Sequence, residues 1–147
     1  MASRLIRLAA LASCLTVVAC SGTRPAYLGI EKNSLEQCPD SPNCVTSVAS
    51  PDDTQHFIEP INTQTNKTPL PALEGIIKSQ GGAIVVNTPT YIYAEFTSDI
   101  MRFVDDVEFL LLPQAKHIEV RSASRLGYKD FDVNRERIEK IRSEFNR

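Results

Sequence analysis

Two arginines on a predicted strand near the C-terminus are the side chains of this chain best suited to bind a ligand. The residues from Ile118 onward alternate with the period of a β-strand, which places Arg121 and Arg125 on one face. Arg135 follows at the start of a predicted helix. Guanidinium groups bind carboxylate and phosphate groups in bidentate fashion, so these three residues are candidates for an anion-binding site. The alternative is that the strand arginines form cross-strand ion pairs.

The opposite face of this strand carries hydroxyl groups. Ser122 and Ser124 point away from the arginines, and Asn134 falls on the apolar stripe of a helix predicted over residues 133–145. A buried amide without partners costs about 1–3 kcal/mol. We therefore expect Asn134 to bond to the two serines if this helix packs on the sheet. The three residues are either a structural network or part of the ligand site.

Several alternating segments are needed to position these residues. They predict strands over 83–87, 91–97, 106–112 and 117–124. Thr68 begins a first helix that ends at Gly81, and a turn at Gly127 leads to Asp132 as the N-cap of helix 133–145. The fold class is therefore α+β, with an antiparallel sheet of four to five strands and two helices packed on one face.

The polar faces of these strands bring acids and tyrosines close to the arginines. The residues in question are Tyr93, Glu95, Asp106, Glu108, Glu119, Arg121 and Arg125. Acids opposite arginines predict a ladder of ion pairs, each of which contributes about 0–1 kcal/mol when exposed to water. The alternative is a groove lined by tyrosines and arginines.

Residues 1–19 have the composition of a signal peptide. Two arginines precede an apolar stretch, and the segment Val17-Val18-Ala19-Cys20 resembles a bacterial lipobox. Cleavage before Cys20 and acylation of its thiol would anchor the chain to a membrane. Because Ser21 rather than Asp follows the cysteine, we expect the periplasmic face of the outer membrane of a bacterial cell envelope. The alternative is an ordinary signal peptide with an incidental cysteine.

The rest of the chain has the size of one domain. Residues 20–36 resemble a tether, in which only a few apolar residues such as Leu28 are suited to docking, and residues 37–147 form the domain. The net charge is −2 for the whole chain and becomes more negative when the two arginines of the signal peptide are removed. A mildly acidic domain gives no electrostatic reason to expect a nucleic-acid partner.

Four cysteines are present, of which Cys14 leaves with the signal peptide and Cys20 is assigned to the lipid. The remaining two, Cys38 and Cys44, flank a turn-prone loop and favour a disulfide in an oxidising compartment. So short a ring contributes about 2 kcal/mol. The alternative is a thiol redox pair, although the spacing is not C-x-x-C.

The residues give less support to two further hypotheses, a serine hydrolase and a metal site. A hydrolase with Ser122 or Ser124 as nucleophile needs a base within hydrogen-bond reach, and His117 lies too far along the same strand. No G-x-S-x-G elbow is present. His56 and His117 are the only histidines and lack the spacing of zinc ligands, so the sequence indicates no metal site and no cofactor.

Three ordered motifs resemble one family. They are Cys38-Pro-x-Ser-Pro-Asn-Cys-Val-x-Ser47, Asp105-Asp-Val-Glu108 and Arg121-Ser-Ala-Ser-Arg-x-Gly-Tyr-x-Asp-Phe-x-Val-Asn-Arg135. Residues 37–146 are similar to the bacterial and plastid family catalogued as domain of unknown function 1499. Thr46 stands where that family usually has serine, and Asp132 where glycine is frequent. The resemblance implies a domain boundary and a set of motif residues but no activity.

From these observations we expect a lipid-anchored envelope module that binds a small anionic ligand or a partner protein through the Arg121 and Arg125 end of the sheet. A redox protein that uses Cys38 and Cys44 is the first alternative. A serine-type hydrolase is the second.

Overall fold

The computed structural model describes residues 21–29 and 33–147. The predicted signal peptide and the acylation of Cys20 lie outside the described residues. In chain order the elements are β1 (Cys44–Thr46), β2 (Ile61–Asn62), α1 (Pro69–Ser79), β3 (Ala83–Asn87), β4 (Tyr91–Thr97), β5 (Val104–Leu112), β6 (His117–Ser124) and α2 (Val133–Phe145).

The predicted strands 83–87, 91–97 and 117–124 and the predicted helix 133–145 are confirmed with the same bounds. The strand predicted over 106–112 begins two residues earlier, at Val104. Strands β1 and β2 were not predicted with these bounds, because three and two residues are too few to show an alternating pattern.

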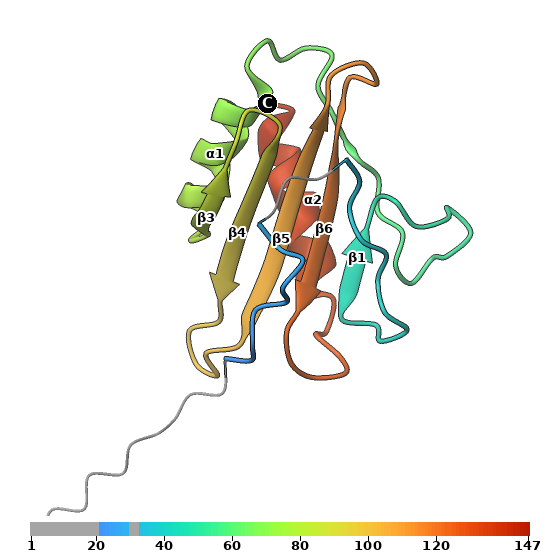
Figure 1. Cartoon of the computed structure of the whole chain (residues 1–147), viewed down its shortest axis with the longest axis vertical. Coiled ribbons are helices and arrows are strands. Elements are labelled where there is room, and N and C mark those ends of the chain that lie inside the picture. Colours follow the sequence, from blue (N-terminus) through green and yellow to red (C-terminus); the bar gives the residue numbers. More distant parts are fainter. Residues whose placement is uncertain (1–20, 30–32) are drawn as a thin grey trace, which may run out of the picture.

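The sheet is antiparallel and runs in the order β1-β6-β5-β4-β3, with β2 also paired to β6. Six strands are described, five of which form the main order, and both helices lie behind one face of the sheet (Figure 1). Helix α1 contacts β3 and β4, and α2 contacts β6 and β1. The predicted α+β fold is confirmed.

The main core lies between the helices and the sheet. Alternation along β4 directs Ile92, Ala94 and Phe96 toward the helices, where they meet Ile138 and other apolar residues of α1 and α2. Ile92, Ala94 and Ile138 have no exposed surface. The buried apolar stripe of α2 is what holds this helix against β6.

The face of the sheet away from the helices is also covered. Tyr91, Tyr93 and Leu110 form a second cluster with Leu28 and Leu35 from the N-terminal segment. This segment lies in front of β5 on the side opposite α2 (Figure 1). The docking of Leu28 is confirmed, and much of the segment interpreted as a tether is packed on the sheet. The polar strand faces are therefore buried rather than solvated.

The start of α2 differs from the expectation in one respect. Gly127 has the expected positive φ of 88°, but Asp132 adopts a left-handed conformation with φ of 66° and makes no side-chain cap bond. Asp130 accepts the bond instead, with its Oδ2 2.9 Å from the backbone nitrogen of Asn134. Glycine is frequent at this position in the family that the sequence resembles, and glycine adopts a left-handed backbone without strain.

Candidate functional site

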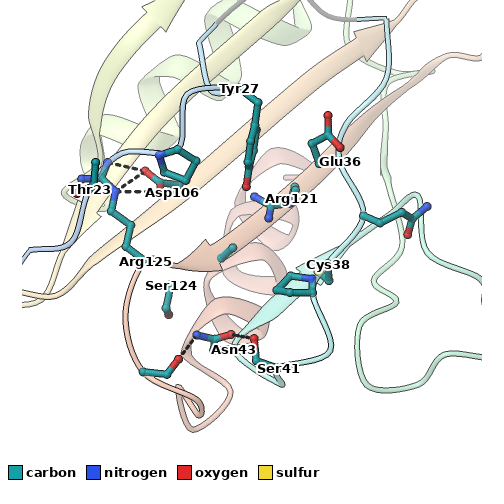
Figure 2. A pocket seen from close by; sticks show the side chains of 15 residues that line it. Thr23, Tyr27, Glu36, Cys38, Ser41, Asn43, Asp106, Arg121, Ser124 and Arg125 are labelled. Atoms are coloured by element: carbon teal, nitrogen blue, oxygen red, sulfur yellow. Dashed lines mark hydrogen bonds and ion pairs between the residues drawn. The ribbon is translucent and has the colours of Figure 1, made fainter.

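A pocket of about 490 Å³ lies between the N-terminal segment and the C-terminal end of β6. Tyr27 and Glu36 line it from the N-terminal segment, Asn43 from the loop before β1, and Arg121 and Arg125 from β6 (Figure 2). The two arginines come to the same pocket because the strand period places them on one face. The structure thus brings together the pair that the sequence analysis singled out.

Arg125 forms hydrogen bonds and ion pairs with side chains of the neighbouring strands β4 and β5. Its Nε lies 3.0 and 2.9 Å from the two carboxylate oxygens of Asp106, and its Nη2 donates to the Tyr93 hydroxyl at 2.9 Å. A further bond from Nη2 reaches Glu95 Oε1. The hydrogen bonds to Asp106 raise the pKa of Arg125 above its ordinary value. At Arg125 the structure thus shows a cross-strand ion pair, which the sequence analysis gave as the alternative to an anion-binding site.

Glu95 ties the N-terminal segment to this network. Its Oε1 accepts hydrogen bonds from Arg24 Nε at 2.8 Å and from the Tyr93 hydroxyl at 2.8 Å, in addition to the bond from Arg125. Burial acts to raise the pKa of Glu95, but the hydrogen bonds from Arg125, Tyr93 and Arg24 outweigh it and lower the pKa. The carboxylate of Glu95 is thus held in its charged form.

Arg121 has fewer internal partners, although only 3% of it is exposed. Its Nη1 lies 3.5 Å from Glu108 Oε2, directly across the β5–β6 pairing, and its guanidinium lies 5.6 Å from the ring centroid of Tyr27. The other oxygen of Glu108 accepts a bond from the Tyr91 hydroxyl at 2.7 Å. The Nε of Arg121 is buried and donates to no acceptor among the described residues.

Ser122, Ser124 and Asn134 form a network on the helix side of the sheet. Ser122 Oγ donates to Asn134 Oδ1 at 2.5 Å, and Asn134 Nδ2 lies 3.0 Å from Ser124 Oγ. The same Nδ2 lies 3.0 Å from the Asn43 carbonyl oxygen and 2.7 Å from Asp130 Oδ2. The predicted bonding of Asn134 to both serines is confirmed. This network holds α2, β6 and the pocket wall at Asn43 together.

The sequence analysis missed Arg137, which completes this network. Its Nη1 donates to Ser122 Oγ at 3.0 Å and to Asn134 Oδ1 at 2.8 Å, and its Nη2 donates to Asp105 Oδ2 at 2.5 Å. Its guanidinium also lies 4.8 Å from the ring centroid of Phe96. The available signal was its position three residues after Asn134, which puts both side chains on one side of a helix.

Arg135 lies apart from the other predicted site residues. Its guanidinium donates to the carbonyl oxygens of Phe57 at 2.8 Å and Gln55 at 3.0 Å, and so holds the loop before β2 against α2. The structure therefore brings Arg121, Arg125 and Ser124 to the pocket. Ser124 also bonds to Asn134, which lies with Ser122 behind the sheet, and Arg135 binds a loop elsewhere.

One known protein family matches most of this chain. Residues 34–145 match the family described as protein of unknown function (DUF1499). The chain belongs to the DUF1499 family. The match confirms the resemblance read from the three motifs and begins three residues before the boundary expected at residue 37. Comparison with curated proteins and with solved structures found no significant match.

The DUF1499 domain contains the expected disulfide between Cys38 and Cys44. Cys44 is fully buried in β1, whereas Cys38 lines the pocket. Between them, Ser41 Oγ donates to Asn43 Oδ1 at 2.7 Å, and Asn43 Nδ2 donates to the Gly127 carbonyl oxygen at 2.7 Å. The disulfide therefore closes the short loop that supplies one wall of the pocket.

The geometry of the DUF1499 domain does not supply a histidine base to Ser122 in β6. Ser122 is fully buried and donates its proton to Asn134. His117 lies five positions along β6, about 16 Å away at the rise of a strand. His56 bonds instead to Asp53 at 2.8 Å, and this hydrogen bond lowers the pKa of Asp53.

Among residues 21–29 and 33–147, no group of three or more histidine, cysteine or acidic side chains is arranged to hold a metal ion. Within the same residues, neither helix has the length and apolar character needed to cross a bilayer.

Proposed function

We propose that this DUF1499 protein is a lipid-anchored module of the bacterial cell envelope that binds a small anionic ligand in the pocket at Arg121. The lipobox ending at Cys20 supports an anchor at the periplasmic face of the outer membrane. The disulfide between Cys38 and Cys44 fits an oxidising compartment. An acidic side chain of an envelope protein is the alternative occupant of the pocket.

The observation that carries this proposal is the state of the Arg121 guanidinium. Its Nε is buried without an acceptor among the described residues, while the side chain lines a pocket of about 490 Å³. A buried donor left unpaired costs about 1–3 kcal/mol. A carboxylate or phosphate oxygen in the pocket supplies the missing acceptor and recovers this cost once the side chains that now cover Nε shift to admit it. The Nε of Arg125, in contrast, already donates a hydrogen bond to Asp106.

The charges around the pocket narrow the class of ligand. Four charged side chains line the pocket: Arg125 is paired with Asp106, Arg121 is paired with Glu108 behind the lining, and Glu36 is exposed. An anionic group near Arg121 is favoured, and a second anionic group near Glu36 is repelled. A ligand with one acidic group and a hydrogen-bond donor, such as an amino acid, fits this pattern better than a polyanion.

The experiment uses native mass spectrometry of the protein purified from its own host, followed by NMR titration with acetate, inorganic phosphate and free glycine. We expect a retained small molecule, or shifts of the Arg121 and Asn43 resonances on titration. Binding should be lost in the double variant Arg121→Gln with Glu108→Gln. Arg135→Gln serves as the control, because this arginine bonds to a loop elsewhere. Unchanged binding in the double variant would refute the pocket.

The double variant is needed because Arg121 is also part of the fold. Removing Arg121 alone breaks a buried ion pair with Glu108, and we expect Arg121→Gln to lower the free energy of unfolding by about 3 kcal/mol. Replacing both partners removes both charges of this ion pair, so the double variant should recover most of this loss. A folded double variant that does not bind separates the ligand role from the structural role.

The placement of Cys38 in the pocket lining favours thiol redox chemistry as a second candidate. The binding module requires instead that the disulfide persists, since Cys44 is fully buried. We expect the pair to stay oxidised in mild reductant while the protein is folded, as measured by mass spectrometry after thiol alkylation. Rapid reduction of the folded protein by a small thiol would favour the redox candidate.

The anchor is tested separately from the pocket. We expect labelled palmitate to appear on the mature protein and to be lost in Cys20→Ala. Mass spectrometry of the mature N-terminus should find a diacylated Cys20. A mature chain that carries no lipid would refute the anchor and leave the pocket proposal standing.

A further inference from the structure

Apolar side chains, most of them exposed, gather at one end of the sheet, in the β4–β5 loop, in the loop that leads from β6 to α2 and at the start of α2. Six of them line one hollow of about 520 Å³: Ile100, Met101, Phe103, Leu126, Phe131 and Val133. We call these six residues the apolar tip. Ile100 is 90% exposed and Phe131 is 87% exposed. Contiguous apolar surface of this kind marks a binding site for an apolar partner.

Two residues in the loops of the apolar tip have an unfavourable left-handed backbone conformation. Phe131 adopts a left-handed conformation with φ of 55°, and Arg102 in the other loop does so with φ of 56°. Side chains with a Cβ rarely adopt this conformation, and such strain persists where the surrounding structure enforces it, commonly at functional sites. Here the strained conformation holds a fully apolar aromatic ring in water, which the folded domain does not need for its own core.

The N-terminal segment begins its contact with the domain at the end of the sheet that carries the apolar tip. The Cα of Gly22 lies so close to β6 that an added Cβ would be 2.9 Å from Arg125 Cβ and 3.1 Å from Leu126 Cγ. Leu126 is itself part of the apolar tip. Figure 1 shows the first described residues, in blue, at the end of the sheet where the β4–β5 and β6–α2 loops lie. In the sequence Cys20 is two residues before Gly22, the residue that packs beside Leu126 of the apolar tip.

We propose that the apolar tip inserts into the surface of a lipid bilayer beside Cys20 and thereby orients the domain on its membrane. This inference rests on the lipid anchor of the proposed function. An anchor within a few residues raises the local concentration of bilayer at the tip, so a modest apolar surface is enough for docking. Aliphatic and aromatic side chains on a peripheral protein insert about 5–10 Å into the interface.

The charges around the apolar tip favour insertion that does not depend on anionic lipid. Arg102 and Lys129 supply positive charge, and Asp99, Asp130 and Asp132 supply negative charge. A further carboxylate in the lining, Asp105, is paired with Arg137. With no excess of positive charge, the tip has no net attraction to an anionic surface. Docking should therefore be similar on vesicles of phosphatidylethanolamine with or without phosphatidylglycerol and should change little with salt.

The chain offers a clean optical test because it contains no tryptophan. In Phe131→Trp the single indole reports on the apolar tip. In Gln114→Trp it reports on the exposed β5–β6 turn at the opposite end of the sheet. The protein used is residues 20–147, which contains every described element. Cys20 supplies the one free thiol, since Cys38 and Cys44 are joined.

The thiol of Cys20 is coupled to maleimide lipid in vesicles that contain brominated phosphatidylcholine. We expect Phe131→Trp to show a blue-shifted emission that the bromine atoms quench, and Gln114→Trp to show neither effect. Adding Ile100→Asp to Phe131→Trp should weaken docking roughly tenfold. Ile100 is 90% exposed, so this change should not unfold the domain.

Three outcomes would overturn the proposal. Unquenched emission from tethered Phe131→Trp would show that the tip stays in water. Equal quenching of both reporters would show that the domain lies on the membrane without a preferred end. A blue shift of Phe131→Trp in the absence of vesicles, with a dimer seen by sedimentation, would show that a second copy covers the tip. Chemical coupling makes all three independent of acylation in the cell.

Discussion

Arg121 and Arg125 illustrate how two side chains of one type on one strand face acquire different roles. Arg125 lies where Asp106 and Glu95 from β5 and β4 converge, and its Nε is satisfied by a carboxylate. Arg121 faces Glu108 at 3.5 Å and keeps an unpaired Nε. Only the second arrangement leaves hydrogen-bonding capacity for a ligand, so the pocket is assigned to Arg121.

Asn134 is a buried residue whose side chain joins three parts of the fold. It is 1% exposed and bonds to groups on β6, in the loop before β1 and in the loop before α2. Asn134→Ala should lower the free energy of unfolding by about 2–3 kcal/mol, because several buried polar atoms lose their partner. Urea unfolding followed by circular dichroism measures the change. The exposed Lys140→Ala on the same helix is the control and should be nearly neutral.

Glu95 predicts how stability responds to acid. Hydrogen bonds from Arg125, Tyr93 and Arg24 hold its folded-state pKa below the ordinary value of 4.5. A carboxylate with a lowered pKa stabilises the fold above its unfolded-state pKa, and this contribution is lost as the pH falls through the folded-state pKa. The free energy of unfolding should therefore decrease between about pH 5 and pH 3.

The variant Glu95→Gln is expected to show a shallower decrease over this range. The measurement is a set of urea unfolding curves at several pH values. Asp52→Asn, at an exposed position, serves as the control and should leave the slope nearly unchanged. An identical slope in Glu95→Gln and the wild-type protein would contradict the assignment.

At the scale of elements, the start of α2 separates two aspartates with different roles. Asp130 accepts bonds from the backbone and side chain of Asn134, so Asp130→Ala should lower the free energy of unfolding by about 1–2 kcal/mol. Asp132 makes no such bond and has φ of 66°, so Asp132→Gly should raise it by up to about 1 kcal/mol. Thermal unfolding of the two variants measures both changes. Equal destabilisation would contradict this division.

At the scale of the whole molecule, the N-terminal segment is part of the folded domain. Leu28 and Leu35 are 7% and 5% exposed and cover Tyr91, Tyr93 and Leu110. The segment also supplies Tyr27 and Glu36 to the pocket. Without it, the polar face of the sheet would be solvated and the pocket would lose one wall.

Leu28→Ala is therefore expected to lower the free energy of unfolding by about 2 kcal/mol or more, because it removes apolar area from the second cluster. It should also speed proteolysis within residues 21–29 and weaken ligand binding at Arg121. Ala26→Ser, at an exposed position of the same segment, is the control. Unchanged stability and proteolysis in Leu28→Ala would show that the segment is not held by this contact.

The sequence alone determined strands β3, β4 and β6, most of β5, the helix over residues 133–145 and the bonding of Asn134 to Ser122 and Ser124. These features follow from local periodicity, and an amide on an apolar helix stripe needs the nearest hydroxyl groups. The lining pair Arg121 and Arg125 follows from the same alternation. Arg137 was missed, because its partner Asp105 lies far away in sequence.

Only the tertiary structure decided which acid pairs with which arginine, that residues 21–29 and Leu35 cover the second face, and that Gly22 packs beside Leu126 of the apolar tip. Each depends on contacts between residues that are distant in sequence. An alternating pattern shows which face a side chain takes, but several acids compete for each guanidinium on that face. Their competition is resolved by strand register and by the burial that the N-terminal segment imposes.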